Sequence, residues 1–206
     1  ITGNVTCDLA PTGFISNGSQ NDSGGTYIYM AIRRPHKPPA GGTDVFNAIS
    51  RSGSSSITTV NSNMGPVDMW LTKSTGDTTA NVLGTRMLGP RTLTTSSTAG
   101  DNTNVFGTSN PWDVQEGVNL TSDGDTNASF RTYINYFFKR TPGFMDVVAY
   151  TGTGSARTVN HNLGVAPEMM WIKNRNDAES WSVYNKDKGA DKNIWLNDYS
   201  GGITND

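Results

Sequence analysis

The stretch of sequence that decides the fold is TVNHNLGVAPEMMWIK, residues 158–173. The chain carries an earlier version of it, TVNSNMGPVDMWLT, at residues 59–72. The turn pattern Thr-Val-Asn-x-Asn-apolar-Gly recurs after 99 residues and the Met-Trp-apolar pattern after 101, because the later copy inserts Val165 and Ala166. A loop absorbs such an insertion easily. Weaker matches on both sides give a period of 100 to 106 residues, which is the size of an independent domain.

This period predicts a division of the chain into three parts. Residues 1–34 are the C-terminal part of one repeat, residues 35–141 are a complete repeat, and residues 142–206 are the N-terminal part of the next. The chain opens and closes at one phase of the repeat, so we expect an excerpt of a longer polypeptide. Each partial copy then needs strands from flanking sequence, from the chain's other end or from a neighbouring molecule.

Composition predicts an all-β protein. Gly, Thr, Asn and Ser make up 89 of 206 residues and Glu occurs only three times, which disfavours helices and suits short strands joined by turns. The net charge of −2 is spread along the chain, so no nucleic-acid surface is indicated. No apolar run is long enough for membrane insertion, which takes about 18 residues. Cys7 is the only cysteine.

Apolar, β-branched and aromatic runs mark the strands. They are Tyr27–Arg34, Val45–Ile49, Ile57–Val60, Met69–Leu71, Tyr133–Arg140, Val147–Tyr150, Arg157–Val159, Met169–Ile172, Trp181–Tyr184 and Asn193–Leu196. No amphipathic helix is found. The spacing predicts tandem antiparallel β-sandwich repeats of jelly-roll or lectin-like type. We expect Trp70 and Trp171 to pack inside their repeats.

The sequence contains no convincing catalytic, cofactor or metal site. Glu168 with Asp187 is the best carboxylate pair for a glycosidase, but the first copy has no such pair, with Val67 at the position that matches Glu168. His36 and His161 lie outside any metal-ligand cluster, and His161 is expected on a turn surface. Gly152–Ala156 resembles part of a nucleophile elbow without its second glycine or following helix.

One acidic loop is a candidate calcium site. Asp123–Asn127, DGDTN, begins like a calcium-binding loop, but Ala128 stands where the pattern needs glycine and Ile134 where it needs an acid. We predict a polar turn there, with weak calcium binding as the alternative.

Aromatic side chains are the candidates for glycan contact, because flat apolar rings with polar rims stack on sugars. We expect most of them to be core, with one or two reaching the surface. The candidates are Trp112, Trp181 and Tyr184.

The second copy resembles a known repeat. Residues 144–152 and 158–173, followed by WSVY at 181–184 and Gly189, are similar to a repeat of roughly a hundred residues and uncharacterised function. That repeat is common in tail-fibre-like and other structural proteins of marine bacteriophages, often in tandem and beside concanavalin-like lectin domains. The first copy departs from it, because Ser62 replaces the histidine and Asn81 and Leu83 replace two aromatics.

The resemblance implies a non-enzymatic structural protein of a phage virion appendage, similar to a tail fibre, that acts in spacing and host-surface adhesion. It implies an extracellular or virion location and a homo-oligomer, either a trimeric fibre or a head-to-tail assembly. Host-surface polysaccharide is a candidate partner. The alternatives are a glycan-binding lectin-like module, a polysaccharide depolymerase, and a subunit of a capsid-associated or free extracellular filament.

Overall fold

The computed structural model describes residues 7–10, 13–16, 39–103, 105–106, 109–198 and 203–205. The chain forms two compact units, residues 1–38 and residues 39–206, and each is considered by itself. In the first unit, β1 (Cys7–Ala10) and β2 (Gly13–Ser16) form an antiparallel hairpin. The predicted strand Tyr27–Arg34 and His36 lie outside the described residues.

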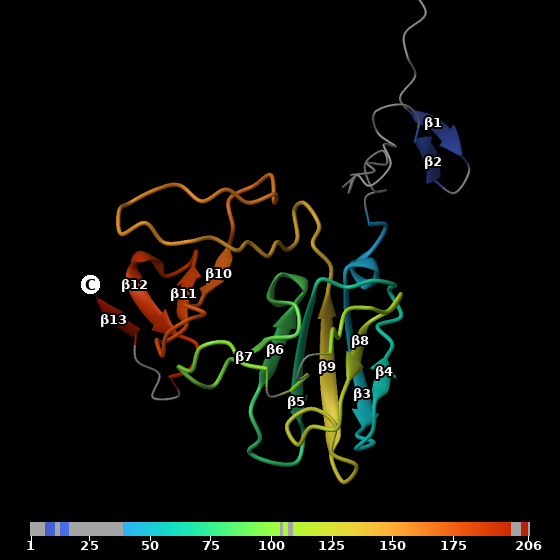
Figure 1. The fold of residues 1–206 in the computed structure, drawn as a ribbon. Helices are drawn as coiled ribbons and strands as arrows, with labels where there is room; N and C mark the ends of the chain where they lie inside the picture. Colours follow the sequence, from blue (N-terminus) through green and yellow to red (C-terminus); the bar gives the residue numbers. More distant parts are fainter. Residues whose placement is uncertain are drawn as a thin grey trace, which may run out of the picture. The chain divides into compact units, whose positions relative to one another are not determined.

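A five-stranded antiparallel sheet organises the first part of the second unit (Figure 1). Its spatial order is β3-β9-β5-β6-β7. Strand β9 therefore lies between β3 and β5, although it is the last of these five strands in the sequence. The strands are β3 (Phe46–Ser52), β5 (Met69–Ser74), β6 (Val82–Thr85), β7 (Thr92–Thr94) and β9 (Thr132–Phe138). A separate two-stranded ladder joins β4 (Thr58–Val60) to β8 (Val118–Leu120).

Strand alternation places one apolar set on each face of this sheet. Trp70 lies opposite Phe137 on β9 and opposite Gly84 on β6, and both aromatic rings are fully buried. The main core on this face comprises Val60, Val67, Trp70, Val82, Val105, Phe106, Trp112, Val118, Leu120 and Phe137. Since β4 and β8 contribute Val60, Val118 and Leu120, their ladder covers this face of the sheet.

The buried side chain of Asn135 lies beside Trp70, and its oxygen and nitrogen both form hydrogen bonds. The Asn135 amide oxygen accepts hydrogen bonds from Trp70 Nε1 at 3.0 Å and from Thr72 Oγ1 at 3.1 Å. Asn135 Nδ2 donates to the Ile49 carbonyl at 3.3 Å. Strands β3, β5 and β9 are thus joined by side chains as well as by their backbone ladders.

A second antiparallel sheet has the order β10-β11-β12-β13. It is built from β10 (Met169–Ile172), β11 (Ser182–Asn185), β12 (Gly189–Trp195) and β13 (Ile203–Asn205). The predictions of strands at Val147–Tyr150 and Arg157–Val159 are wrong, because these residues have no strand structure and are mostly exposed. Strands need partners, and no described strand lies beside either segment.

The two sheets of this unit meet through a small second core. Trp181, just before β11, packs with Leu83, Leu88 and Leu93, and its Nε1 donates to the Thr94 carbonyl at 2.9 Å. Nearby, the Asp101 amide donates to the Arg175 carbonyl at 2.8 Å. Gly100 permits this approach, since a Cβ there would lie 2.6 Å from the Arg175 carbonyl oxygen.

A carboxylate between two arginines adds to this contact. Asp101 accepts hydrogen bonds from Arg91 Nε at 2.7 Å and Arg175 Nε at 2.8 Å, and its side chain is 7% exposed. Burial opposes ionisation, but the two guanidinium groups outweigh it and hold the pKa of Asp101 below its ordinary value. The ion pairs therefore persist to a lower pH than an isolated aspartate would allow.

Asp101→Asn is expected to lower the free energy of unfolding at pH 7 by about 1–2 kcal/mol, a figure reduced because both arginines are partly exposed. A depressed folded-state pKa contributes stability that is complete above the unfolded pKa of about 3.9 and is lost as pH falls through the folded value. Urea unfolding at several pH values should therefore show the difference between variant and wild type shrinking in acid. An equal difference at pH 7 and well below the folded pKa would contradict this assignment.

The fold class is all-β with antiparallel sheets. Helical structure in the described residues is limited to two 3₁₀ turns, Gly42–Asp44 and Arg86–Leu88. Among these residues, no ladder joins the strands of 39–141 to those of 142–205. The division into repeats at 34/35 and 141/142 stays a prediction.

Candidate functional site

Strand β10 is the most unusual surface of the second unit, because an apolar strand lies in solvent. Met169, Met170, Trp171 and Ile172 are all exposed, with Trp171 at 39%. Within the described chain β10 pairs only with β11, so its other edge carries no ladder. An unpaired apolar edge is a template for another strand.

The matching strand of the first copy shows what such an edge normally carries. β5 has β6 on one side and β9 on the other, with Met69 opposite Phe138. The two residues that follow β9 contact the segment before β5, since Lys139 Nζ donates to the Met64 carbonyl and the Arg140 backbone amide donates to Asp68 Oδ2 at 2.8 Å. Strand β10 has the counterpart of β6 but none of these β9 contacts in the part of the chain that the structure describes.

The two ladders also differ in register. The repeated sequence aligns Trp70 with Trp171, yet Trp70 lies opposite Gly84 whereas Trp171 lies opposite Val183. The repeat aligns Val183 with Val82, so Trp171 takes the place that Thr72, opposite Val82, has in the first sheet. This displacement of two residues leaves the faces of the strand unchanged. Trp171 is exposed because it belongs to neither core cluster of the described residues. The prediction that Trp171 is packed inside is wrong for this chain.

An acidic side chain marks the start of β10. The Glu168 side chain is 79% exposed, and its carboxylate lies 3.1 Å from Lys186 Nζ, which is also exposed. The Lys186 amide donates to the Glu168 carbonyl at 2.8 Å. Glu168 directly precedes β10 as Asp68 precedes β5, so it can meet cations at the end of an added strand.

The predicted glycan contacts lie in different places. Trp112 and Trp181 are buried, and their indole nitrogens donate to the Gly89 and Thr94 carbonyls, each at 2.9 Å. Neither ring offers a free face to a ligand. Tyr184 is half-buried on β11, opposite Met170. The structure does not bring the three residues together in one site.

The described residues considered for catalysis and metal binding lie in or beside turns and have structural contacts. Asp187 donates its amide to Asn185 Oδ1 at 3.0 Å in a tight turn, while Glu168 is paired with Lys186. His161 is on an exposed turn, as predicted, and its Nδ1 accepts from the Leu163 amide at 3.2 Å. No helix follows Gly152–Ala156.

The DGDTN loop is a polar turn, as predicted. Asp123 Oδ1 accepts from the amides of Asp125 and Thr126 at 2.9 and 3.1 Å. The Asn127 amide donates to the Asp123 carbonyl at 2.8 Å. Within the described ranges, no three acidic, histidine or cysteine side chains are grouped to hold a metal ion.

The sequence contains a partial signal for the β10 surface. The match between Tyr27–Arg34 and Tyr133–Arg140 indicated that a β9-type strand belongs in each copy. It did not indicate that β10 would be left with an open edge beside a folded β11 and β12.

Among the helices of the described residues, none has the length and apolar character needed to cross a bilayer.

Comparison with known proteins identifies a family. A model described as a domain of unknown function (DUF7483) matches residues 41–205. The matched range lies within the second compact unit and runs across the predicted repeat boundary at 141/142. No curated protein matches the chain, and no solved structure matches it.

Proposed function

The chain belongs to the DUF7483 family, and we propose that it is a non-enzymatic structural module of a bacteriophage virion appendage similar to a tail fibre. In this role it spaces the fibre and takes part in adhesion to the host surface. Its units are tandem sandwich repeats of jelly-roll or lectin-like type, in a trimeric fibre or a head-to-tail assembly. The observation that carries the proposal is the apolar edge of β10, which has no ladder partner among the described residues.

The open edge supports assembly by strand addition. Met169–Ile172 expose four consecutive apolar side chains, and adding a strand would cover part of this apolar surface while satisfying the edge hydrogen bonds. The sequence of the required strand is known from β9, which covers the matching edge of β5. Tyr27–Arg34 has the same pattern of aromatic and apolar residues closed by two cations. A repeat can thus supply what the next one lacks.

Charge supports the same arrangement. A β9-type strand placed on β10 as β9 lies on β5 would set its last aromatic residue opposite Met170, which the repeat aligns with Met69, and the second of its two cations opposite Glu168. In the first copy the Arg140 backbone amide donates to Asp68, while the Arg140 guanidinium pairs with Asp146. An exposed ion pair between an added cation and Glu168 would contribute little affinity, but it would favour one direction and register of the added strand.

The layers of residues 39–141 support the sandwich. The five-stranded sheet has the β4–β8 ladder over its Trp70 face, with the main core between them. Two antiparallel layers around one core are the arrangement of a β-sandwich.

A direct test supplies the missing strand in trans. The sequence YINYFFKR of residues 133–140 is fused to a soluble carrier and mixed with the full chain. We expect hydrogen exchange to slow by about tenfold or more at the amides of Met169–Ile172 that point away from β11, because these groups become part of a new ladder. The Trp171 fluorescence should shift to shorter wavelength, and Trp171→Phe should remove that shift.

Matched variants define the contact. Glu168→Gln is expected to weaken carrier binding about two- to fivefold, as for an exposed ion pair, while Asp187→Asn serves as the control acid outside the edge. A carrier with serine at every aromatic position should give no protection. The proposal fails if β10 exchanges equally fast with and without the strand, or if the serine carrier protects it equally well.

A further inference from the structure

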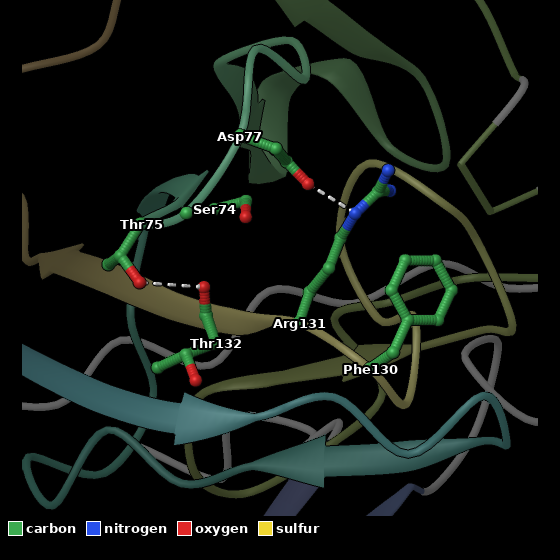
Figure 2. A pocket seen from close by; sticks show the side chains of 7 residues that line it. Ser74, Thr75, Asp77, Phe130, Arg131 and Thr132 are labelled. Atoms are coloured by element: carbon green, nitrogen blue, oxygen red, sulfur yellow. Dashed lines mark hydrogen bonds and ion pairs between the residues drawn. The ribbon is translucent and has the colours of Figure 1, made fainter.

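A pocket lies on the second unit at the end of β5, away from β10. Its volume is about 320 Å³, at the lower end of the range of roughly 300–1,000 Å³ for ligand pockets. The turn after β5 forms one wall and the residues leading into β9 form the other (Figure 2). The lining residues are Ser74, Thr75, Gly76, Asp77, Phe130, Arg131 and Thr132.

An exposed aromatic ring forms the rim of this pocket. Phe130 is 80% exposed, which makes it one of the two most exposed large apolar residues described. The Arg131 guanidinium lies 4.8 Å from the ring centroid and holds the ring in place by a cation–π contact. Phe130 belongs to no core cluster, so packing does not explain its position.

The opposite wall offers charge and hydrogen-bonding groups. Asp77 forms an ion pair with Arg131 Nε, and Figure 2 shows both side chains meeting across the pocket. Asp77 Oδ1 also accepts from the Thr79 hydroxyl at 2.7 Å and amide at 3.0 Å. The Thr79 hydroxyl, then its amide, hold the pKa of Asp77 below its ordinary value, so the carboxylate is an acceptor at neutral pH.

A buried hydroxyl in the pocket has no partner of normal hydrogen-bond geometry. Ser74 is 2% exposed, and its Oγ makes no such bond, although it lies near enough to favour the ionised form of Asp77. Figure 2 shows this oxygen turned toward the space between Asp77 and Arg131. Since an unsatisfied buried hydroxyl costs stability, its position indicates that a ligand or solvent oxygen completes it.

These features favour one class of ligand. Vicinal hydroxyls of a sugar match an acceptor beside a donor, and the C–H face of a sugar ring matches an exposed aromatic. The charge of Arg131 is already balanced by Asp77, which disfavours a simple anion site. The volume accommodates a small ligand such as a single sugar ring.

We propose that this pocket binds a neutral saccharide, with one ring stacked on Phe130 and its hydroxyls bonded to Asp77 and Arg131. The inference rests on the adhesive role in the proposed function and is independent of strand addition at β10. It assigns adhesion to a pocket at the end of β5 and not to Trp112 or Trp181.

The test uses the full chain and methyl glycosides of glucose, galactose, mannose, fucose and N-acetylglucosamine as probes, with methyl glucuronide as the acidic comparison. Ligand-observed NMR should detect at least one neutral glycoside at millimolar affinity, about −4 kcal/mol. Phe130→Ala should weaken its binding by about tenfold or more, in line with the loss of a stacking platform. Phe130→Trp should retain it.

Phe144→Ala is the matched control, because Phe144 is also exposed but lies outside the pocket. Asp77→Asn tests the polar wall and should also abolish binding, and unchanged circular dichroism shows that each variant is folded. Binding of none of the neutral glycosides, preference for the glucuronide, or unaltered binding by Phe130→Ala would each overturn the assignment. Slowed exchange at β10 with the carrier strand, found together with such a failure, would leave the assembly role standing alone.

Discussion

Trp70→Ala is expected to lower the free energy of unfolding by about 3–5 kcal/mol, the usual range for removing a buried tryptophan. The indole is fully buried and lies against Phe106 with ring centroids 5.8 Å apart. Removing it leaves a cavity between the sheet and the β4–β8 ladder. The substitution also removes the hydrogen bond from Trp70 Nε1 to the buried Asn135 Oδ1. Of the two donors Trp70 and Thr72, only Thr72 then remains. Urea unfolding monitored by circular dichroism gives the measurement.

Trp171→Ala is the matched control for this prediction. The repeated sequence gives both tryptophans the same neighbours, and sequence reasoning alone expects both to be core. Because Trp171 is 39% exposed on an open strand, we expect its truncation to cost less than about 1 kcal/mol. Equal losses for the two variants would show that Trp171 is buried in solution, and that the β10 edge is already covered.

Local pattern predicted the strands where both the pattern and a partner are present. The runs at Val45–Ile49, Met69–Leu71 and Tyr133–Arg140 correspond to β3, β5 and β9, because alternating side chains match the two faces of a sheet. The same kind of run at Val147–Tyr150 gave no strand. Pattern specifies which face is apolar but does not supply the neighbouring backbone.

Strand order was not predictable from the chain by the same means. The sequence shows that β9 is a strong strand, but not that it enters between β3 and β5. That choice depends on long-range contacts such as Trp70 with Phe137 and Asn135 with Trp70. A repeat in the sequence indicates equivalent strands, and even so the registers of the β5–β6 and β10–β11 ladders differ by two residues at their tryptophans.

The saccharide pocket lay beyond sequence reasoning for a related reason. Asp77 and Arg131 stand far apart in the chain and meet only because β5 pairs with β9. From its residue type, Phe130 would be expected in the core, whereas it is among the most exposed apolar residues described. Aromatic type alone also selected Trp112 and Trp181, whose rings are needed inside the protein.

Trp181→Ala is expected to have an effect as large as that of Trp70→Ala, about 3–5 kcal/mol, but in a different part of the molecule. Trp181 comes from the second copy, yet its ring packs with Leu83, Leu88 and Leu93 of the first sheet. Its Nε1 donates to the Thr94 carbonyl at the end of β7. The residue is therefore the main apolar link between the two sheets.

The expected result is a loss of cooperativity as well as of stability. In the wild type, β11 and β12 should share the protection of the five-stranded sheet, since opening them exposes the second core. In Trp181→Ala, hydrogen exchange in residues 182–195 should accelerate far more than exchange in β5 and β9, because the main core around Trp70 stays intact. The Arg175–Asp101 contact remains as a weaker link, so Trp181→Ala combined with Asp101→Asn should uncouple the sheets further. Equal acceleration in β5 and β11 would mean that both sheets depend on one core, and that the two sequence copies do not act as separate folding units.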